Sequence, residues 1–352
     1  MTKAFVLMTA MPPTKGHLNL IRFAASLPVS QVTVLVCTQP FEPYAWERAN
    51  AVEQACRTLN FADGSTMLTV KHLNRELEQD SRTPGFWPMW DSIMREHGFK
   101  AGDLCVSSEG YGATLAGRLQ GHFVPYDPAR ELYFTKATNI REHMVDYFDD
   151  ILPEFQPYLT TRVTIFGAES TGKTTLSKEL AEVVNGHWIY EWARPFLELT
   201  GKPINASTMG EIWRGQNATQ KHAGMFRDKP FIIQDTDLFS TIGYWDQKHW
   251  REPLGMSPEN LWDDAYATKS DLYLMTSEYN VPFEPDPLRY GVDHRESGDD
   301  YWEDLLVKMG LPYCILDHNS YENRLAQAKS LVLDCAKKKA ESIYFEREAN
   351  GR

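Results

Sequence analysis

Short apolar runs alternate with amphipathic segments through the first half of the chain. The apolar runs, which favour strands, lie at residues 3–9, 31–38, 66–73, 103–108 and 122–126. Segments with the 3.6-residue spacing of helices lie between and after them, at 18–24, 47–60, 86–97, 111–119 and 138–148. Apolar strands alternating with helices are typical of a parallel sheet that is covered on both faces. We therefore predict a Rossmann-like α/β domain that binds ligands at the carboxyl ends of its strands.

The alternation stops at residues 149–160 (DDILPEFQPYLT), which contain two prolines and lack a helical period. It then restarts, with further strands expected at 161–166, 187–190, 230–234, 271–275 and 312–316 and a final helix from about 320 to 346. We predict a domain over residues 1–150, a linker over 151–160 and a second parallel-sheet domain over 161–352. A length of 352 residues agrees with two domains.

Composition narrows the possible partners. The chain carries 48 Asp and Glu against 36 Lys and Arg, a formal charge of -12, which disfavours binding to nucleic acid or anionic membranes. Its five cysteines are scattered and form no zinc-binding pattern, as in reduced cytosolic proteins. Neither a secretory signal nor an apolar stretch of about 20 residues is visible. We expect a cytoplasmic protein, and the sequence leaves a homo-oligomer open.

The second half contains a phosphate-binding loop. Residues 167–174 (GAESTGKT) fit the pattern GxxxxGK[ST] and lie between a predicted strand and a predicted helix, as this motif requires. Backbone N–H groups of such a loop surround phosphates, the Lys reaches the β- and γ-phosphates and the hydroxyl of the last residue holds Mg²⁺. The residues expected to bind ATP are Gly167, Ala168, Glu169, Ser170, Thr171, Gly172, Lys173, Thr174 and Thr175.

Three carboxylates near strand ends are candidates for phosphoryl-transfer chemistry. Asp235 follows the strand FIIQ, where a carboxylate can act on Mg²⁺, so Thr174 and Asp235 are the candidate metal ligands. Glu191 follows the strand HWIY and is a candidate base for a substrate hydroxyl; Asp237 is its rival. Each of these acids could instead cap a helix, and for Asp237 the two roles are equally supported by the sequence. Arg289 and Arg295 occupy a Gly- and Pro-bearing stretch that suits a lid over the transferring phosphoryl group.

A second phosphate site is predicted at the other end of the chain. Thr14, Lys15, Gly16 and His17 follow the first strand and open a helix, resembling the [HT]xGH turn of nucleotidyltransferases. The helix N-terminus attracts phosphate, and His17 can donate to the phosphate under attack. Downstream, Thr138 and Arg141 resemble the end of the motif ISxTxxR, whose Thr and Arg bind the β- and γ-phosphates.

Together these motifs resemble the NadR-type proteins, which join an adenylyltransferase for nicotinamide mononucleotide (NMN) to a ribosylnicotinamide kinase. The likeness covers nearly the whole chain, through SSEGYGATLAGRL, YDPAR, TKATNIR, GAESTGKT, YEWAR, QDTD and LDHNSYENR. It implies that Trp87 and Trp90, in TPGFWPMW, stack on the nicotinamide ring. This ring is cationic, and aromatic faces attract cations. Met8, Ala10, Thr14 and Lys136 depart from the usual motif residues. The helix-turn-helix domain of many NadR proteins is expected to be absent.

The resemblance implies a bifunctional enzyme of NAD salvage. Nicotinamide riboside and ATP would give NMN in the second domain, and NMN and ATP would give NAD and pyrophosphate in the first, with Mg²⁺ as cofactor. Two alternatives stay open. One is a phosphopantetheine adenylyltransferase fused to dephospho-coenzyme A kinase, which also pairs TxGH with a P-loop. The other is a nucleotide-sensing regulator without turnover.

Overall fold

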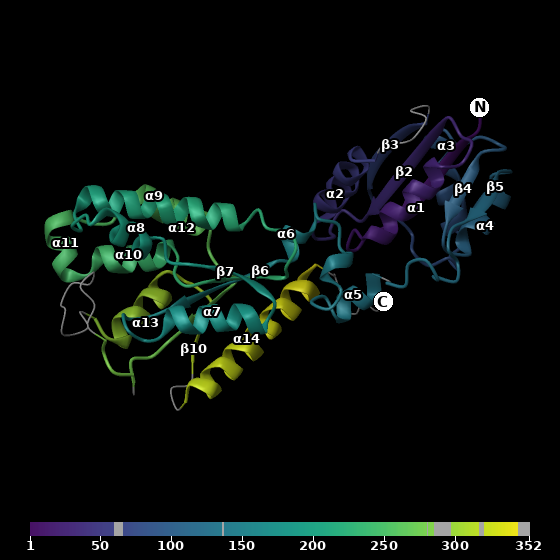
Figure 1. Ribbon diagram of the computed structural model, residues 1–352. Helices are drawn as coiled ribbons and strands as arrows, with labels where there is room; N and C mark the ends of the chain where they lie inside the picture. The colour runs from purple at the N-terminus through teal and green to yellow at the C-terminus, as the bar shows by residue number, and fades with distance from the viewer. Residues whose placement is uncertain (60–65, 136, 280, 285–296, 317–319, 344–352) are drawn as a thin grey trace. The chain divides into compact units, whose positions relative to one another are not determined.

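The computed structural model describes residues 1–59, 66–135, 137–279, 281–284, 297–316 and 320–343 (Figure 1). The chain divides into two compact units, Met1–Tyr158 with Lys339–Arg352, and Leu159–Lys338. No helix within the described ranges is both long and apolar enough to cross a membrane.

The first unit is built on a five-stranded parallel sheet of order β3-β2-β1-β4-β5. Its strands are β1 (Lys3–Met8), β2 (Gln31–Thr38), β3 (Met67–Asn74), β4 (Leu104–Ser107) and β5 (His122–Pro125). Alternate side chains of β1 enter two different cores: Ala4 and Val6 pack with α1 (Lys15–Ala25) and α2 (Ala45–Arg57). Phe5 and Leu7 pack on the opposite face with α3 (Phe86–Glu96) and α4 (Tyr111–Arg118). The predicted sheet with both faces covered is confirmed.

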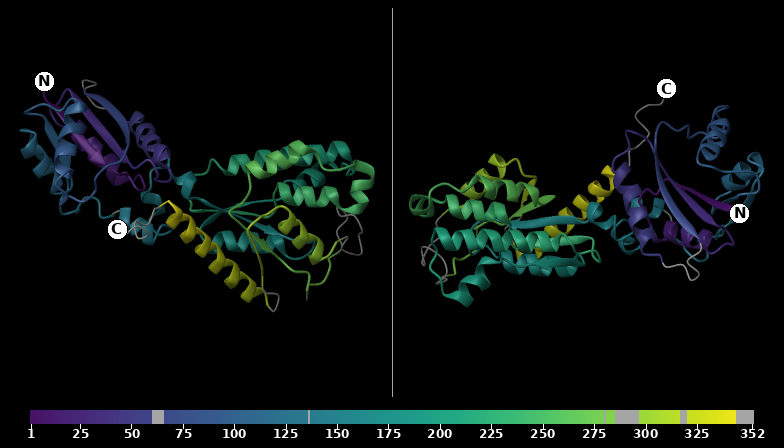
Figure 2. Two further views of the ribbon diagram at one scale, coloured as in Figure 1. Left: turned by 180° about the vertical axis from the view of Figure 1, so that it is seen from behind. Right: turned by 90° about the horizontal axis from the view of Figure 1, so that it is seen from above.

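The second unit contains another five-stranded parallel sheet, of order β10-β9-β6-β8-β7. Its strands are β6 (Thr161–Phe166), β7 (Gly186–Ile189), β8 (Phe231–Gln234), β9 (Leu272–Met275) and β10 (Tyr313–Ile315). Helices lie on both sides of the sheet, with α7 on one side and α9 and α12 on the other (Figures 1 and 2). Its helices are α7 (Lys173–Val183), α8 (Ala193–Thr200), α9 (Ala206–Ala223), α10 (Leu238–Asp246), α11 (Lys248–Leu254), α12 (Glu259–Ala267), α13 (Asp299–Lys308) and α14 (Tyr321–Ser342). The predicted fold class is thus confirmed in both halves.

Residues 151–160, which the sequence predicts to be a linker, are packed in the structure. Ile151 forms a bridge with Thr14, and Leu152 joins the core of the first unit. Phe155 is fully buried and lies 6.3 Å from the ring of Tyr44. The segment continues into the short helix α6 (Gln156–Leu159), and the apolar side chains around its two prolines bury their surface.

Two other expectations differ from the structure. The helix expected over 138–148 ends early, as α5 (Ala137–Glu142), and a 3-10 turn (Phe148–Asp150) follows it. The second domain is expected over 161–352, whereas the second compact unit covers Leu159–Lys338.

Candidate active sites

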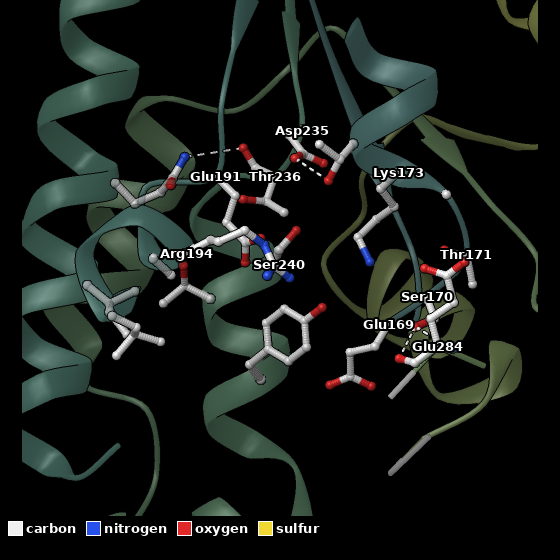
Figure 3. A pocket seen from close by; sticks show the side chains of 18 of the residues that line it. Glu169, Ser170, Thr171, Lys173, Glu191, Arg194, Asp235, Thr236, Ser240 and Glu284 are labelled. Atoms are coloured by element: carbon white, nitrogen blue, oxygen red, sulfur yellow. Dashed lines mark hydrogen bonds between the residues drawn. The ribbon is translucent and has the colours of Figure 1, made fainter. Parts of the chain in front are cut away.

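A cavity of about 400 Å³ in the second unit lies at the carboxyl ends of β6, β7 and β8 (Figure 3). Its polar wall joins the loop after β6 to Glu191, which follows β7, and to Asp235, which follows β8. Seven of the predicted ATP-binding residues line it, namely Glu169, Ser170, Thr171, Gly172, Lys173, Thr174 and Thr175. Gly167 and Ala168 belong to the same loop but do not line the cavity. The three segments meet because the ends of parallel strands share one edge of the sheet.

The loop has the backbone that a phosphate cradle needs. Gly172, with φ +82°, is the N-cap of α7, and this left-handed conformation favours glycine. The Lys173 ammonium donates to the loop's own carbonyls, to Gly167 (2.9 Å) and Ala168 (2.6 Å). Two outside contacts hold Thr171: its hydroxyl meets that of Thr276 (2.6 Å), and its carbonyl accepts from Arg324 (3.1 Å). The buried Arg324 is a supporting residue that the motif did not reveal.

Thr174 and Asp235 lie together at the centre of this wall, where the Thr174 hydroxyl donates to the Asp235 carboxylate (2.7 Å). Burial, with the charge of Glu191 nearby, raises the pKa of Asp235 to about 6. A hydroxyl and a carboxylate are the hard oxygen donors that Mg²⁺ accepts, and Mg²⁺ commonly takes its other ligands from phosphates and water. No group of three or more His, Cys, Asp or Glu side chains that could hold a metal ion occurs among the described residues. The donor set fits Mg²⁺.

The two rival bases have different surroundings. Glu191 lines the cavity, with the guanidinium of Arg194 beside it in Figure 3. Asp237 is instead the N-cap of α10, where it accepts from the N–H of Ser240 (3.0 Å) and from the hydroxyl of Tyr273 (2.7 Å). It is fully buried and is not among the cavity residues. Asp237 is therefore a helix cap, as the capping alternative predicted. Of the two rival bases, Glu191 is the one that faces the cavity.

The far wall of the cavity is largely apolar. It is lined by Leu197, Ile204, Met209, Ile212 and Tyr244. An apolar pocket bounded by a few polar groups is typical of a site for a small organic molecule. The P-loop thus forms one end of the cavity and apolar side chains form the other, with Glu191 and Arg194 between them.

The predicted lid arginines, Arg289 and Arg295, lie outside the residues that the structure describes, and so does Lys136.

The first unit has its own cavity, of about 560 Å³, at the carboxyl end of its sheet. It brings together segments that lie far apart in the sequence. The predicted residues that line it are Thr14, Gly16, His17, Trp87, Trp90, Thr138 and Arg141. Lys15 is exposed and does not line the cavity. The guanidinium of Arg141 donates to Thr138 (3.0 Å), one turn earlier on α5.

The side chain of His17 is held in one tautomer. The backbone N–H of Thr14 donates to its Nδ1 (3.1 Å), and the Thr14 hydroxyl lies 2.8 Å from the same atom. Because Nδ1 accepts a bond, the proton of the neutral ring is on Nε2. Burial, with the charge of Arg130 in second place, lowers the pKa of His17 to about 4. At neutral pH His17 is therefore an uncharged donor.

Gly16 has a steric role that the motif did not indicate. A Cβ at this position would lie 2.5 Å from the ring of Tyr133, which also lines the cavity. The loop that carries Tyr133 is fixed by Asp127, whose carboxylate accepts the N–H groups of Glu131 (2.7 Å) and Tyr133 (3.0 Å). The motif predicts close approach of a phosphate at Gly16; in the structure the ring of Tyr133 occupies the space beside it.

Arg130 is a further cation at this cavity. It lines the wall, bridges to Glu109 (3.5 Å) and lowers the pKa of His17 by its charge. Arg130 belongs to YDPAR, one of the segments that resemble NadR proteins, but no role was assigned to this segment from the sequence.

The two tryptophans line the first cavity and also touch its core. Trp87 and Trp90 pack against the cluster formed by α3, α4 and the sheet. The guanidinium of Arg118 lies 6.0 Å from the centre of the Trp87 ring and is paired with Asp91 (2.7 Å). The Nε1 atom of Trp90 is buried without a partner. Part of each ring therefore serves packing, and their stacking on a ligand stays a prediction.

Comparison with known proteins places these features in a wider group. The second unit matches a family model described as an AAA domain over residues 162–324. Two curated relatives bear the name trifunctional NAD biosynthesis/regulator protein NadR, one from Escherichia coli (strain K12) and one from Salmonella typhimurium (strain LT2). Each is 26% identical to the chain over 264 residues, which cover 71% of this chain and 62% of the relative. The chain is similar in sequence to these NadR proteins.

The NadR likeness extends to three dimensions. A crystal structure of NadR protein in complex with NAD and AMP-PNP matches 99% of this chain and 98% of its own, with a TM-score of 0.64 and 19% identity. A NadR structure in complex with NR matches 96% of each chain, with a TM-score of 0.63 and 20% identity. The predicted resemblance to NadR proteins is confirmed. The aligned part of the chain spans less than two thirds of the length of the curated NadR relatives.

Proposed function

We propose that the chain is a bifunctional enzyme of NAD synthesis, with one reaction in each unit. The second unit would phosphorylate nicotinamide riboside with ATP, giving NMN and ADP. The first would join NMN to the adenylyl group of ATP, giving NAD and pyrophosphate. The observation that carries the proposal is that one chain contains two cavities, one lined by the P-loop with Glu191 and Asp235, the other by His17, Thr138 and Arg141.

In the kinase reaction, the 5′-hydroxyl oxygen of the riboside attacks the γ-phosphorus of ATP and ADP leaves. The P-loop amides and Lys173 would hold the phosphates, which requires the ammonium to leave the carbonyls of Gly167 and Ala168. Glu191 would accept the hydroxyl proton, and Arg194 would stabilise the negative charge of the transferring group. When bound, Mg²⁺ held by Thr174 and Asp235 would supply further charge neutralisation.

In the adenylyl transfer, a phosphate oxygen of NMN attacks the α-phosphorus of ATP and pyrophosphate leaves. His17 would donate from Nε2 to the phosphate under attack, which gains charge in the transition state. Thr138, Arg141 and Arg130 would bind the leaving β- and γ-phosphates. Trp87 and Trp90 would contact the cationic nicotinamide ring. Neither reaction needs a covalent enzyme intermediate.

The ligands in the related structures support this assignment. The NadR structures were solved with NAD and AMP-PNP, and with NR, the usual abbreviation of nicotinamide riboside. Their overall match extends through both units of this chain.

Measuring the two half-reactions separately tests the proposal. With ATP and Mg²⁺, nicotinamide riboside should yield NMN and ADP, and NMN should yield NAD and pyrophosphate. The products are separable by chromatography. Absence of either reaction from folded protein would remove the corresponding half of the proposal, and absence of both with retained NAD binding would favour a nucleotide sensor.

A further inference from the structure

A buried glutamine joins the two loops that carry the kinase carboxylates. Gln216 lies on α9, is 2% exposed and lines the cavity of the second unit. Its side-chain oxygen accepts from the backbone N–H of Trp192 (3.0 Å), and its side-chain nitrogen donates to the carbonyl of Thr236 (3.2 Å). Trp192 directly follows Glu191, and Thr236 directly follows Asp235.

The position of this bridge follows from the sheet. β7 and β8 pair in parallel, with Ile189 opposite Gln234. Backbone pairing continues to Asp235, whose N–H donates to the carbonyl of Ile189 (2.9 Å). Past this point the segment after β7 turns into α8 and the segment after β8 turns into α10. The Gln216 amide connects these two segments. A primary amide has the donor and acceptor of a peptide group, so it can serve as one more rung between the diverging chains.

The two partners also fix how the amide is oriented. The N–H of Trp192 can only donate and the carbonyl of Thr236 can only accept, so only one orientation of the amide satisfies both. A carboxylate could not donate to Thr236, and an apolar side chain would leave two buried backbone groups without this partner.

The residue before Gln216 lets the bridge form. A Cβ at Gly215 would lie 2.2 Å from the ring of Trp192, so glycine allows that ring to rest on α9. The ring stacks on Phe196 of α8 at 4.6 Å. Trp192 is thus fixed on α9 by its ring as well as by its N–H group.

We infer that Gln216 is a positioning residue for phosphoryl transfer, which sets the separation of Glu191 and Asp235 by holding the backbone next to each. The inference rests on the proposed kinase activity. Misplacement of a catalytic group by about 1 Å costs on the order of 10²-fold in rate, so a buried link beside both carboxylates has a large effect on kcat. Thr171 of the P-loop is held by Thr276 and Arg324, two contacts that do not involve this link.

The helix supplies a matched control one turn later. Gln220 is 1% exposed and also uses its amide inside the unit, accepting from Leu238 N–H (3.0 Å) and donating toward the carbonyl of Thr268 (3.4 Å). It does not line the cavity. Gln216→Met and Gln220→Met therefore remove the same buried amide from the same helix, but only the first faces the carboxylates.

The test compares kcat, the KM for ATP and the thermal midpoint of wild type and both variants in the full-length protein. Gln216→Met should lower kcat for nicotinamide riboside by roughly 10- to 100-fold, with little change in the KM for ATP. Gln220→Met should lose a similar amount of thermal stability and keep the wild-type kcat.

Equal losses of kcat in the two variants, or a kcat for Gln216→Met within about 2-fold of wild type, would overturn the inference. Should Gln216→Met fail to fold, Gln216→Glu replaces it, because it keeps the volume and the acceptor for Trp192 but cannot donate to Thr236. Wild type that ignores nicotinamide riboside would refute the proposed function instead. The same variants are then compared by their slow hydrolysis of ATP, which uses the same carboxylates.

Discussion

Burial shifts the pKa of His17 in the first cavity and of Asp235 in the second. His17 stays neutral above a pH of about 4, and Asp235 becomes fully ionised only above a pH of about 6. His17 can therefore donate through Nε2 over the whole physiological range. Asp235 retains a carboxylate that is costly to ionise, as is common where function places a charge in a buried site.

Replacing Asp235 with Asn should inactivate the kinase and stabilise the fold at neutral pH. The folded-state pKa of about 6 exceeds the usual carboxyl value, so ionised Asp235 opposes folding. The cost is absent below a pH of about 4, grows between 4 and 6 and is constant above that range, where it is about 2–3 kcal/mol. Asn avoids it. Thermal unfolding at pH 4 and pH 8 measures the difference, and an equal change of stability at both values would contradict the assigned pKa.

His17→Ala should lower adenylyl transfer by about 10²-fold or more, the usual cost of losing a donor to transition-state charge. Phosphorylation of nicotinamide riboside should persist, since that reaction uses the other unit. Initial rates of both half-reactions give the result. An unchanged rate of NAD formation from NMN would show that the TKGH segment is only a turn.

At the scale of elements, apolar periodicity located the central strands closely because they are buried on both faces. The strand over 31–38 has the predicted bounds, and in both units a cavity lies at the carboxyl ends of the strands. The helix expected over 138–148 failed because its apolar residues pack individually, with Met144 and Phe148 buried beyond the end of α5. A pattern of apolar residues does not distinguish such packing from a regular helix.

Candidate residues inside motifs were easier to predict than those supplied by packing. The P-loop and the TKGH segment are local sequences, so their residues could be named in advance. Gln216 lines the second cavity from α9, which no motif covers. Arg324 supports the P-loop from the end of LDHNSYENR, a segment to which no residue role was assigned. Tyr133 reaches the first cavity from a loop whose path depends on the Asp127 carboxylate. Such contributions require tertiary structure.

The contact between the α1 N-terminus and the loop over residues 127–135 can be tested by a pair of substitutions. Gly16→Ala should destabilise the protein by about 1–3 kcal/mol and slow adenylyl transfer, because the new Cβ would overlap the Tyr133 ring. Combining it with Tyr133→Ala should restore part of the loss, whereas additive effects would show that the two residues do not interact. Thermal unfolding and NAD formation from NMN are the measurements, and kinase activity is the control.

At the scale of the whole molecule, each of the two sheets has its own cavity, and we propose one reaction for each. Lys173→Met should abolish phosphorylation of nicotinamide riboside, because it removes the cation from the P-loop, and leave conversion of NMN to NAD nearly intact. Rates of ADP and pyrophosphate release distinguish the two reactions. Loss of both activities from a variant that is still folded would contradict the assignment of one reaction to each unit.

The central claim is that one chain converts nicotinamide riboside to NAD, and the by-products of that conversion test it most directly. The wild-type protein, given nicotinamide riboside, ATP and Mg²⁺, should form NAD with one ADP and one pyrophosphate for each molecule, because each cavity uses one ATP. Phosphopantetheine, supplied in place of NMN, should not be adenylylated. Equal yields of ADP, pyrophosphate and NAD at completion are the predicted result. Adenylylation of phosphopantetheine with NMN left unused would contradict the claim.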